Sequence, residues 1–353
     1  MLAQCTARGL DGLLAVSRGA SSVDSYADVF YLSNHYGNMG FTPDFQSYWV
    51  GRSHSAVVLA PEREPRLIVD GPDYRRDLVT IEDVRFELDF PAAVAGALRD
   101  FRLERARLGV SGLNVMSARV HRQLLELLPG AELVDADDLV EGLRVIKSPF
   151  ELRKMRAAAE VGSAVVSAIM ERALAPGATE GQAVAAGYSI GIAAGVAFFD
   201  TAVASGPYSN YFTFGHLPSW SGRVLKEGEL FHADSYGAVE GYLFDFGRTC
   251  VVGGNASVEQ RALLDAAVEA VEQGIAAIRP GVKASAVFDA VHGYLRREGL
   301  AIGDSADIQN ASALSIGFPP HGHGLGLGWE WPWLLPTEER ELKGGMCLAV
   351  EAM

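Results

Sequence analysis

Apolar and polar residues alternate in short segments along the first part of the chain. Three short apolar runs predict β-strands, and two longer mixed segments predict helices. The strands are expected at 12–16, 55–59 and 67–69, and the helices at 92–101 and 120–128. A long aromatic loop, 33–54, separates the first two strands, and loops of this length in compact domains are usually functional. This pattern predicts an α/β domain over residues 1–145.

The pattern changes after Lys147 to long helices with sharply marked ends. Three helix starts carry a Ser or Thr at the N-cap with a Glu or Gln three residues later, which is a capping box. These pairs are Ser148 with Glu151, Thr179 with Gln182, and Ser257 with Gln260. The first helix is expected to end near Leu174, before a Pro-Gly turn, and a further helix is expected over 285–298.

A short sequence repeat suggests that the second domain, 146–353, contains two similar halves. Residues 173–184 and 277–288 align, and each is the end of a long helix, a Pro-Gly turn and the start of a second helix. A β region follows each helix pair. We therefore expect a pseudo-twofold arrangement of two α/β halves.

The uncharged segment 182–199 has nearly the length of a membrane span. A spanning helix needs about 20 strongly apolar residues, whereas this segment is rich in Ala and Gly and contains Gln182, Tyr188 and Ser189. We interpret it as a buried helix that leads into a strand.

Charge and cysteine content narrow the class of protein. The 353 residues carry a net charge of −14, which argues against binding to nucleic acid or to an anionic membrane surface. The three cysteines have no CxxC spacing, as is usual in a reducing compartment. The first residues lack the pattern of a secretory signal. These features favour a cytoplasmic protein.

The strongest chemical signal is a predicted β-hairpin over 230–253. Asp234 and Asp245 are equally far from a turn placed at Val239–Glu240, so we expect them to face each other across the two strands. Two opposed carboxylates repel each other, and a cation between them removes that cost. Alternatively, one of them faces solvent or pairs with Arg248.

Further candidate residues follow in three separate segments. His323 stands between glycines in HGHGLGLGWEWPW, and His321, two residues earlier, is expected on the same side of a strand. A phosphate loop is excluded there because the GxGxxG spacing is absent, and a purely structural histidine is the alternative. Glu351 ends an apolar run that by itself is only a strand terminus, and His216 ends the loop 203–216.

Together, the order and spacing of these segments resemble the pita-bread family of M24 metallopeptidase-like proteins, which includes methionine aminopeptidase, prolidase, aminopeptidase P and creatinase. The resemblance extends to the segments 143–161, 175–180 and 244–249. It implies a mixed α/β fold, with a small N-terminal creatinase-like domain and a C-terminal pita-bread fold of two pseudo-symmetric halves.

The resemblance also implies a site with two divalent metal ions. Asp234 would bind one ion, Asp245 would bridge both, and His323 and Glu351 would bind the other. Glu351 would also accept a proton, and His216 would contact the substrate. Oxygen-rich ligands with one imidazole suit Mn, Fe, Co or Zn. The substrate would be a short peptide or a small molecule, with His232, Trp329, Arg248 and Tyr211 as further candidate contacts. In relatives a partner subunit closes the site, which implies a homodimer.

Three departures from the family pattern affect this interpretation. The family usually has a fifth ligand, a bridging Glu on a later strand, and we expect that the given sequence lacks these last strands. Peptidases of the family usually carry His-Glu where this chain has Trp329-Glu330. His232 lies two residues before Asp234, and we favour packing against the helix layer over a role as an additional ligand.

Three functions therefore compete. The first is a metal-dependent hydrolase of the Xaa-Pro dipeptidase or aminopeptidase type, in which a metal-activated water attacks an amide. The second is a pita-bread hydrolase or lyase that acts on a small non-peptide metabolite, which Trp329 and His232 favour. The third is a metal-free binding module, which the retained Asp234 and Asp245 oppose.

Overall fold

The computed structural model describes residues 1–19, 25–37, 53–209, 217–300 and 321–352. The chain divides into two compact units, Met1–Arg144 and Val145–Met353. Each unit has its own sheets, helices and apolar core, so each is described by itself.

The first unit is built on a six-stranded mixed sheet with the order β4-β3-β2-β1-β5-β6. The pairs β1–β2 and β2–β3 are antiparallel, whereas the pairs β1–β5, β3–β4 and β5–β6 are parallel. The strands are β1 (Gly12–Arg18), β2 (His54–Leu59), β3 (Arg66–Val69), β4 (Asp83–Phe86), β5 (Arg107–Ser111) and β6 (Glu132–Asp135). The three strands predicted from apolar runs are present.

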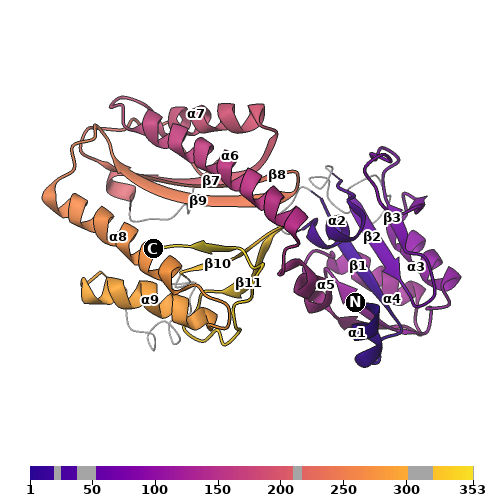
Figure 1. Ribbon diagram of the computed structural model, residues 1–353. Helices are drawn as coiled ribbons and strands as arrows, with labels where there is room; N and C mark the ends of the chain where they lie inside the picture. The colour runs from indigo at the N-terminus through magenta and orange to yellow at the C-terminus, as the bar shows by residue number, and fades with distance from the viewer. Residues whose placement is uncertain (20–24, 38–52, 210–216, 301–320, 353) are drawn as a thin grey trace. The chain divides into compact units, whose positions relative to one another are not determined.

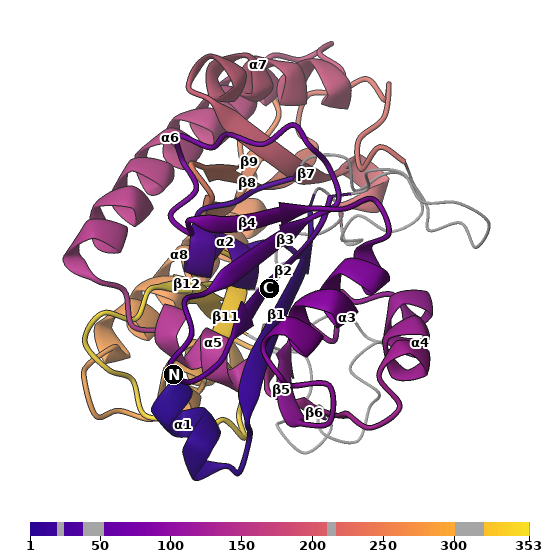
Figure 2. The same ribbon diagram turned by 90° about the vertical axis from the view of Figure 1, so that its right-hand side faces the viewer.

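Helices cover both faces of this sheet, which explains why its central strand is apolar at successive positions. On β1, Leu14 and Val16 face one core, and Leu13 and Ala15 face the other. The first core lies under α3 (Phe90–Asp100) and α4 (Ala118–Leu127), the two helices predicted for this domain. The second core includes residues of α1 (Leu2–Ala7), α2 (Ala27–Ser33) and α5 (Asp137–Arg144). The two groups of helices flank the sheet in Figure 2.

The second unit begins with two helices and a three-stranded antiparallel sheet. The elements are α6 (Pro149–Ala173), α7 (Glu180–Ala193), β7 (Val196–Ser205), a 3-10 turn (Gly206–Tyr208), β8 (Leu230–Val239) and β9 (Tyr242–Val251). The strand order is β7-β8-β9, and α6 packs on β8 and β9. Figure 1 shows α6 and α7 together on one side of the three strands. The capping boxes predicted at Ser148 and Thr179 both form.

The same order of elements then recurs. The later elements are α8 (Val258–Ala277), α9 (Ala284–Arg297), β10 (Gly322–Leu325), β11 (Trp329–Trp333) and β12 (Leu348–Val350). Their strands form a second three-stranded sheet in the order β11-β10-β12, and α8 and α9 pack against each other. The capping box predicted at Ser257 forms as well.

Corresponding positions of the two halves have the same backbone contacts. Gly177 and Gly281 both have a φ of 85° in the turn between the two helices. The next helix is preceded in each half by an isolated antiparallel bridge, Thr179 with Val224 and Lys283 with Glu341. The short sequence repeat therefore marks a real structural repeat, and the predicted two-half architecture is confirmed.

The uncharged segment 182–199 spans most of α7 and the start of β7, so the predicted helix that leads into a strand is present. The helix is not buried as predicted, because only one side of it packs inward, and Ile190 and Ile192 are 41% and 66% exposed. Among the described residues, no helix is both long and apolar enough to cross a membrane.

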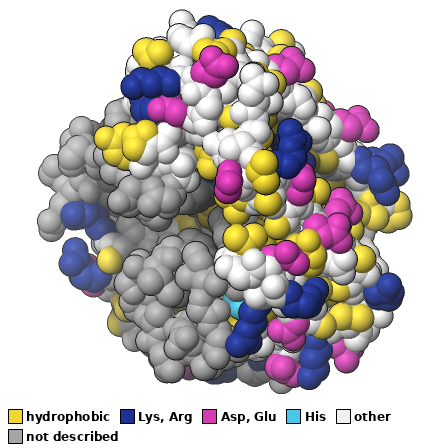
Figure 3. Space-filling model, turned by 90° about the vertical axis from the view of Figure 1, so that its left-hand side faces the viewer, with side chains coloured by type: hydrophobic (Ala, Val, Ile, Leu, Met, Phe, Trp, Pro, Cys, Tyr) yellow, Lys and Arg dark blue, Asp and Glu magenta, His cyan; other side chains and the backbone are white. Residues whose placement is uncertain are grey.

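On one face of the molecule, side chains of both charges lie at close range (Figure 3). On the face shown in Figure 3, acidic and basic side chains of the described residues lie beside one another and beside apolar groups. Neighbouring opposite charges partly cancel each other's field.

Candidate metal centre

The β8–β9 hairpin separates a packed face from a polar face by simple alternation. Phe231 and Ala233 on β8 are buried in the core that α6 and α7 cover. Asp234 and Tyr236 point to the opposite face of the same strand because side chains alternate along a strand. On β9, Asp245 lies directly across from Tyr236, so the two aspartates share this polar face.

The predicted pairing of Asp234 with Asp245 is wrong by two residues. The turn consists of Glu240 and Gly241, which both have positive φ, as two-residue hairpin turns require. This turn places Asp234 opposite Gly247 rather than opposite Asp245. A shift by two keeps each side chain on its face, so the aspartates remain diagonal neighbours across the hairpin.

The second half supplies an imidazole and another carboxylate in a similar way. His323 on β10 pairs with Ala349 on β12, and Glu351 follows two residues later. The backbone N–H of Glu351 donates to the carbonyl of His321 at 3.0 Å, which extends the ladder past the end of β12. His323 and Glu351 are therefore diagonal neighbours on adjacent antiparallel strands.

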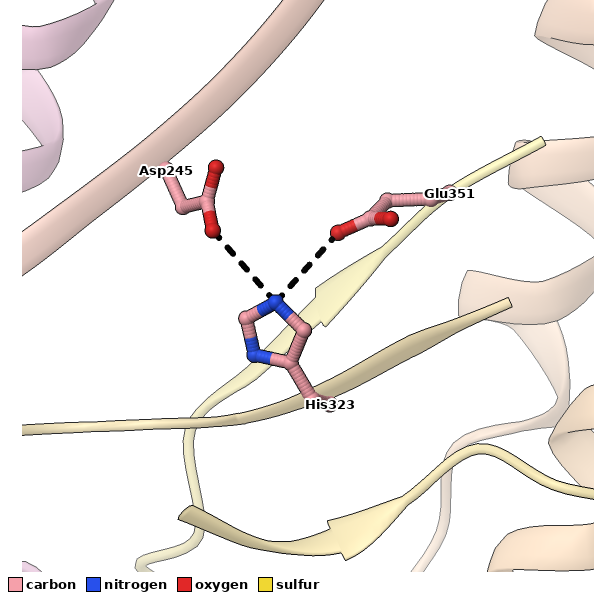
Figure 4. A group of neighbouring side chains, drawn as sticks. All are labelled: Asp245, His323 and Glu351. Atoms are coloured by element: carbon pink, nitrogen blue, oxygen red, sulfur yellow. Dashed lines mark ion pairs between the residues drawn. The ribbon is translucent and has the colours of Figure 1, made fainter. Parts of the chain in front are cut away.

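Three side chains from the two halves converge at one point. His323 Nε2 lies 3.3 Å from Asp245 Oδ2 and 3.5 Å from Glu351 Oε1. The imidazole nitrogen points between the two carboxylates in Figure 4. One ligand atom from each of the three residues falls within 4.8 Å of the others, which is close enough to hold one metal ion.

The orientation of His323 suits a metal ligand. Its Nδ1 lies 2.9 Å from the carbonyl oxygen of Gly324, an acceptor that requires a proton on Nδ1. In the neutral ring Nε2 then carries the lone pair, and this nitrogen faces Asp245 and Glu351. Metal-binding histidines are commonly fixed in this way by a hydrogen bond from the other ring nitrogen.

The carboxylates are crowded, and the crowding is visible in their pKa values. Burial, followed by the negative charges of Asp245 and Glu351, raises the pKa of Asp234 well above its ordinary value. Burial also raises the pKa of Glu351 to about 7, against the effect of nearby His323. Clustered acids with an imidazole nitrogen among them are stabilised when a cation lies between them. The residues thus fit one or more divalent ions.

Trp329 lies at this cluster, whereas the next residue turns away from it. The indole Nε1–H of Trp329 donates to Asp245 Oδ2 at 3.0 Å. Its ring also contacts Tyr236 and His323, with centroid distances of 5.6 and 5.5 Å. Glu330 is fully buried on the other side of β11 and forms an ion pair with Lys147 at 2.6 Å.

His232 lies on the polar face, so the favoured prediction that it packs against the helix layer is wrong. It alternates with the buried residues Phe231 and Ala233, and its Nδ1 lies 2.9 Å from the hydroxyl of Thr249 on β9. Burial lowers its pKa to about 4. His232 is therefore a neutral imidazole two residues from Asp234 on the same face.

Two other predictions are corrected by the backbone. Arg248 is on the opposite face of β9 from Asp245, with its guanidinium over the ring of Phe246, so it does not reach the cluster. His321 does not share the direction of His323, because Gly322 between them has a φ of 125° and breaks the alternation. His321 instead stacks on Phe288 of α9. His216 and Tyr211 lie outside the described residues.

Sequence reasoning missed two features around the cluster. Tyr236 lies on the polar face beside Asp245 and Trp329, and its position two residues after Asp234 was the available signal. The buried pair of Lys147 and Glu330 had no signal in the sequence, because 183 residues separate the two side chains.

Comparison with known proteins adds the family context. Residues 153–353 match the model of metallopeptidase family M24, and residues 1–146 match the creatinase/prolidase N-terminal domain. Among solved structures, prolidase from Pyrococcus furiosus superposes with a TM-score of 0.75 at 22% identity, covering 99% of this chain and 90% of that one. This likeness shows the fold and confirms the mixed α/β architecture with a creatinase-like N-terminal domain.

Two of the curated proteins that are similar in sequence are hydrolases by name. An uncharacterized hydrolase/peptidase, y4tL, from Sinorhizobium fredii is 27% identical over 297 residues, which cover 78% of this chain and 72% of that protein. Ectoine hydrolase from Halomonas elongata is 28% identical over 250 residues, which cover 67% of this chain and 60% of that protein.

Proposed function

This chain belongs to metallopeptidase family M24, and we propose that it is a dinuclear-metal hydrolase of the Xaa-Pro dipeptidase type that cleaves an amide bond in a short peptide. The observation that carries the proposal is the convergence of Asp245, His323 and Glu351, from three different strands or strand ends, within 4.8 Å. Asp234 lies close enough for the charges of Asp245 and Glu351 to raise its pKa.

The four residues divide into two overlapping ligand sets. Asp234 and Asp245 would hold one ion, and Asp245, His323 and Glu351 would hold the other, with Asp245 shared. When bound, such ions lower the pKa of a water molecule and polarise an amide carbonyl. Mn, Fe, Co and Zn all suit these donor atoms.

The protein's own groups would perform the remaining steps. The side chain of Glu351 keeps 29% of its surface exposed, so its carboxylate would be within reach of the attacking water as a proton acceptor. The side chains of His323 and Asp245 are each 7% exposed, which excludes bulk water from the centre of the cluster. His216, assigned from the family resemblance, would contact the substrate.

Metal analysis combined with a dipeptide assay tests this proposal. The protein purified without chelators is expected to hold two divalent ions per chain and to hydrolyse Xaa-Pro dipeptides, with activity lost on chelation and regained with Mn²⁺ or Co²⁺. A folded protein that binds no divalent ion under saturating conditions would contradict the proposal.

A second function is favoured by one specific observation. Trp329 donates its indole N–H to Asp245 at the position where peptidases of the family usually carry a histidine. An indole cannot accept or shuttle a proton, and this favours hydrolysis of a small non-peptide metabolite over that of a dipeptide. The similarity to ectoine hydrolase points the same way.

The variant Trp329→His separates the two functions. If the protein is a peptidase, the imidazole is expected to increase its dipeptidase activity. If it acts on a small metabolite, the folded variant shows no gain, and wild type instead turns over a compound from a panel of small non-peptide amides.

A further inference from the structure

The hydrogen bond from Trp329 ends on a particular oxygen of Asp245. Its indole Nε1–H donates to Oδ2 at 3.0 Å, and the same Oδ2 lies 3.3 Å from His323 Nε2. The indole occupies one acceptor direction of Oδ2. A carboxylate oxygen offers about two such directions, so one remains for an ion on an oxygen that lies within 4.8 Å of the ligand atoms of His323 and Glu351.

The indole is held in place by two ring contacts and through its strand. Tyr236 on β8 and His323 on β10 contact the ring at centroid distances of 5.6 and 5.5 Å. The adjacent residue, Glu330, is fully buried, accepts from Lys147 Nζ at 2.6 Å, and pairs with Gly324 in the ladder. A slip of β11 would bury the charge of Glu330 without Lys147, which is costly. The position of the Trp329 donor is therefore set before any ligand binds.

We propose that Trp329 is a positioning residue that orients Asp245 for the ion held by His323 and Glu351. This inference rests on the proposed dinuclear function. Outer donors that fix a metal-binding side chain commonly contribute about 10- to 100-fold to metal affinity. Because Trp329 bonds Oδ2 on the side of His323, its effect falls on the ion at His323 and Glu351 and spares the ion at Asp234.

The test is a Mn²⁺ titration of the metal-free protein, with free Mn²⁺ measured by its EPR signal. Trp329→Phe removes the N–H donor and keeps an aromatic ring between Tyr236 and His323. One of the two dissociation constants is expected to rise by about 10- to 100-fold and the other to stay at its wild-type value. Equal shifts of both constants, or no shift, would overturn the inference.

Trp331→Phe is the matched control. Trp331 lies on the same strand with the same exposure, 37%, and its ring stacks under Arg340 at 4.2 Å. This variant is expected to keep both dissociation constants. If it loses affinity as Trp329→Phe does, the effect comes from β11 as a whole and the inference fails.

A measurement on wild type covers the case in which Trp329→Phe does not fold. Zn²⁺ is added to protein labelled with ¹⁵N-tryptophan, and the indole N–H signals are followed by NMR. The Trp329 signal is expected to be protected from solvent exchange and to shift with one of the two equivalents of Zn²⁺ and not with the other. Exchange as fast as that of Trp331 would overturn the inference. If wild type binds only one ion, or none, the dinuclear function itself fails, and that result is distinct from two ions with an unaffected Trp329→Phe.

Discussion

The two halves of the second unit share a scaffold and divide the chemistry between them. Each half places its two candidate ligands as diagonal neighbours on adjacent antiparallel strands. A small residue stands directly opposite the first ligand in each case, Gly247 across from Asp234 and Ala349 across from His323. A small opposing side chain leaves room for the ligand and for what it binds, so the same backbone arrangement creates both ligand pairs.

The difference between the halves lies in the donor atoms and in the strands. The two candidate ligands of the first half, Asp234 and Asp245, are both carboxylates, and they lie on β8 and β9, which are ten residues each and paired along their full length. The second half offers an imidazole and a carboxylate on strands of four and three residues, with a bulge between His323 and Gly324. A repeated fold can therefore hold an unrepeated site, because helix packing depends on the apolar faces of the strands and the ligands occupy the other faces.

The largest effect is expected where the halves meet. Asp245→Asn removes the carboxylate that faces both His323 and Asp234, and turnover is expected to fall about 10³-fold or more, since metal ions supply several kcal/mol of catalysis. The metal-free variant is expected to be no less stable than wild type, because one of three crowded acids is neutralised. Steady-state kinetics and thermal unfolding measure the two effects.

Glu240→Gln is the matched control for Asp245→Asn. It is also an acid-to-amide change on the same hairpin, at the exposed turn, where Glu240 pairs with Lys154. Its turnover should equal that of wild type. Wild-type turnover in Asp245→Asn itself would show that the metal mechanism is wrong.

The next largest effect is expected from breaking a buried ion pair that joins the two halves. Lys147, just before α6, and Glu330, on β11, form an ion pair with side chains only 2% and 0% exposed. Lys147→Met leaves a buried carboxylate without its cation, and the free energy of unfolding is expected to fall by about 3–5 kcal/mol. Urea unfolding with an unchanged m-value measures the loss.

An exposed ion pair within the first half provides the comparison. Lys154 and Glu240 have side chains 32% and 65% exposed, and pairs of this kind contribute about 0–1 kcal/mol. Lys154→Met should therefore have a much smaller effect than Lys147→Met. Similar losses in the two variants would mean that burial does not distinguish the two pairs.

The smallest effect is expected from substitutions at the equivalent starts of α7 and α9, which differ in their N-cap residues. Thr179 accepts a hydrogen bond from the backbone N–H of Gln182 at 3.1 Å, whereas Lys283, at the corresponding position of α9, makes no side-chain cap bond. Thr179→Ala is expected to cost about 1 kcal/mol, and Lys283→Ala clearly less. Urea unfolding measures the change in the free energy of unfolding for both variants. An equal decrease in the two variants would contradict a capping role for Thr179.

Local signals in the sequence account for most of the fold. The capping residues Ser148, Thr179 and Ser257 each contact backbone within three residues, so their effect does not depend on distant parts of the chain. Apolar runs such as 12–16 give strands because both faces of β1 are buried. The repeat of 173–184 at 277–288 predicted two halves because the turn between the helices has the same requirements in each.

Details that depend on strand register were harder to predict from the sequence. Because the turn lies at Glu240–Gly241, the partner of Asp234 is two residues away from the predicted one. The predicted face of each side chain was still correct, because side chains alternate with a period of two. The positive φ of Gly322 turns His321 toward Phe288 in the helix layer. Simple alternation along the strand does not predict this direction. His232 was expected among the helices, yet alternation from Asp234 already placed it on the polar face.

The sequence by itself determined which residues have ligand chemistry, where the helices begin, and that the second unit is built twice, because these properties depend on neighbours along the chain. Only the tertiary structure decided that Asp245, His323 and Glu351 meet at one point, that Trp329 donates to Asp245, and that Lys147 lies buried against Glu330. These contacts join residues far apart in sequence, and the packing of one half against the other sets their distances. No local pattern contains that information.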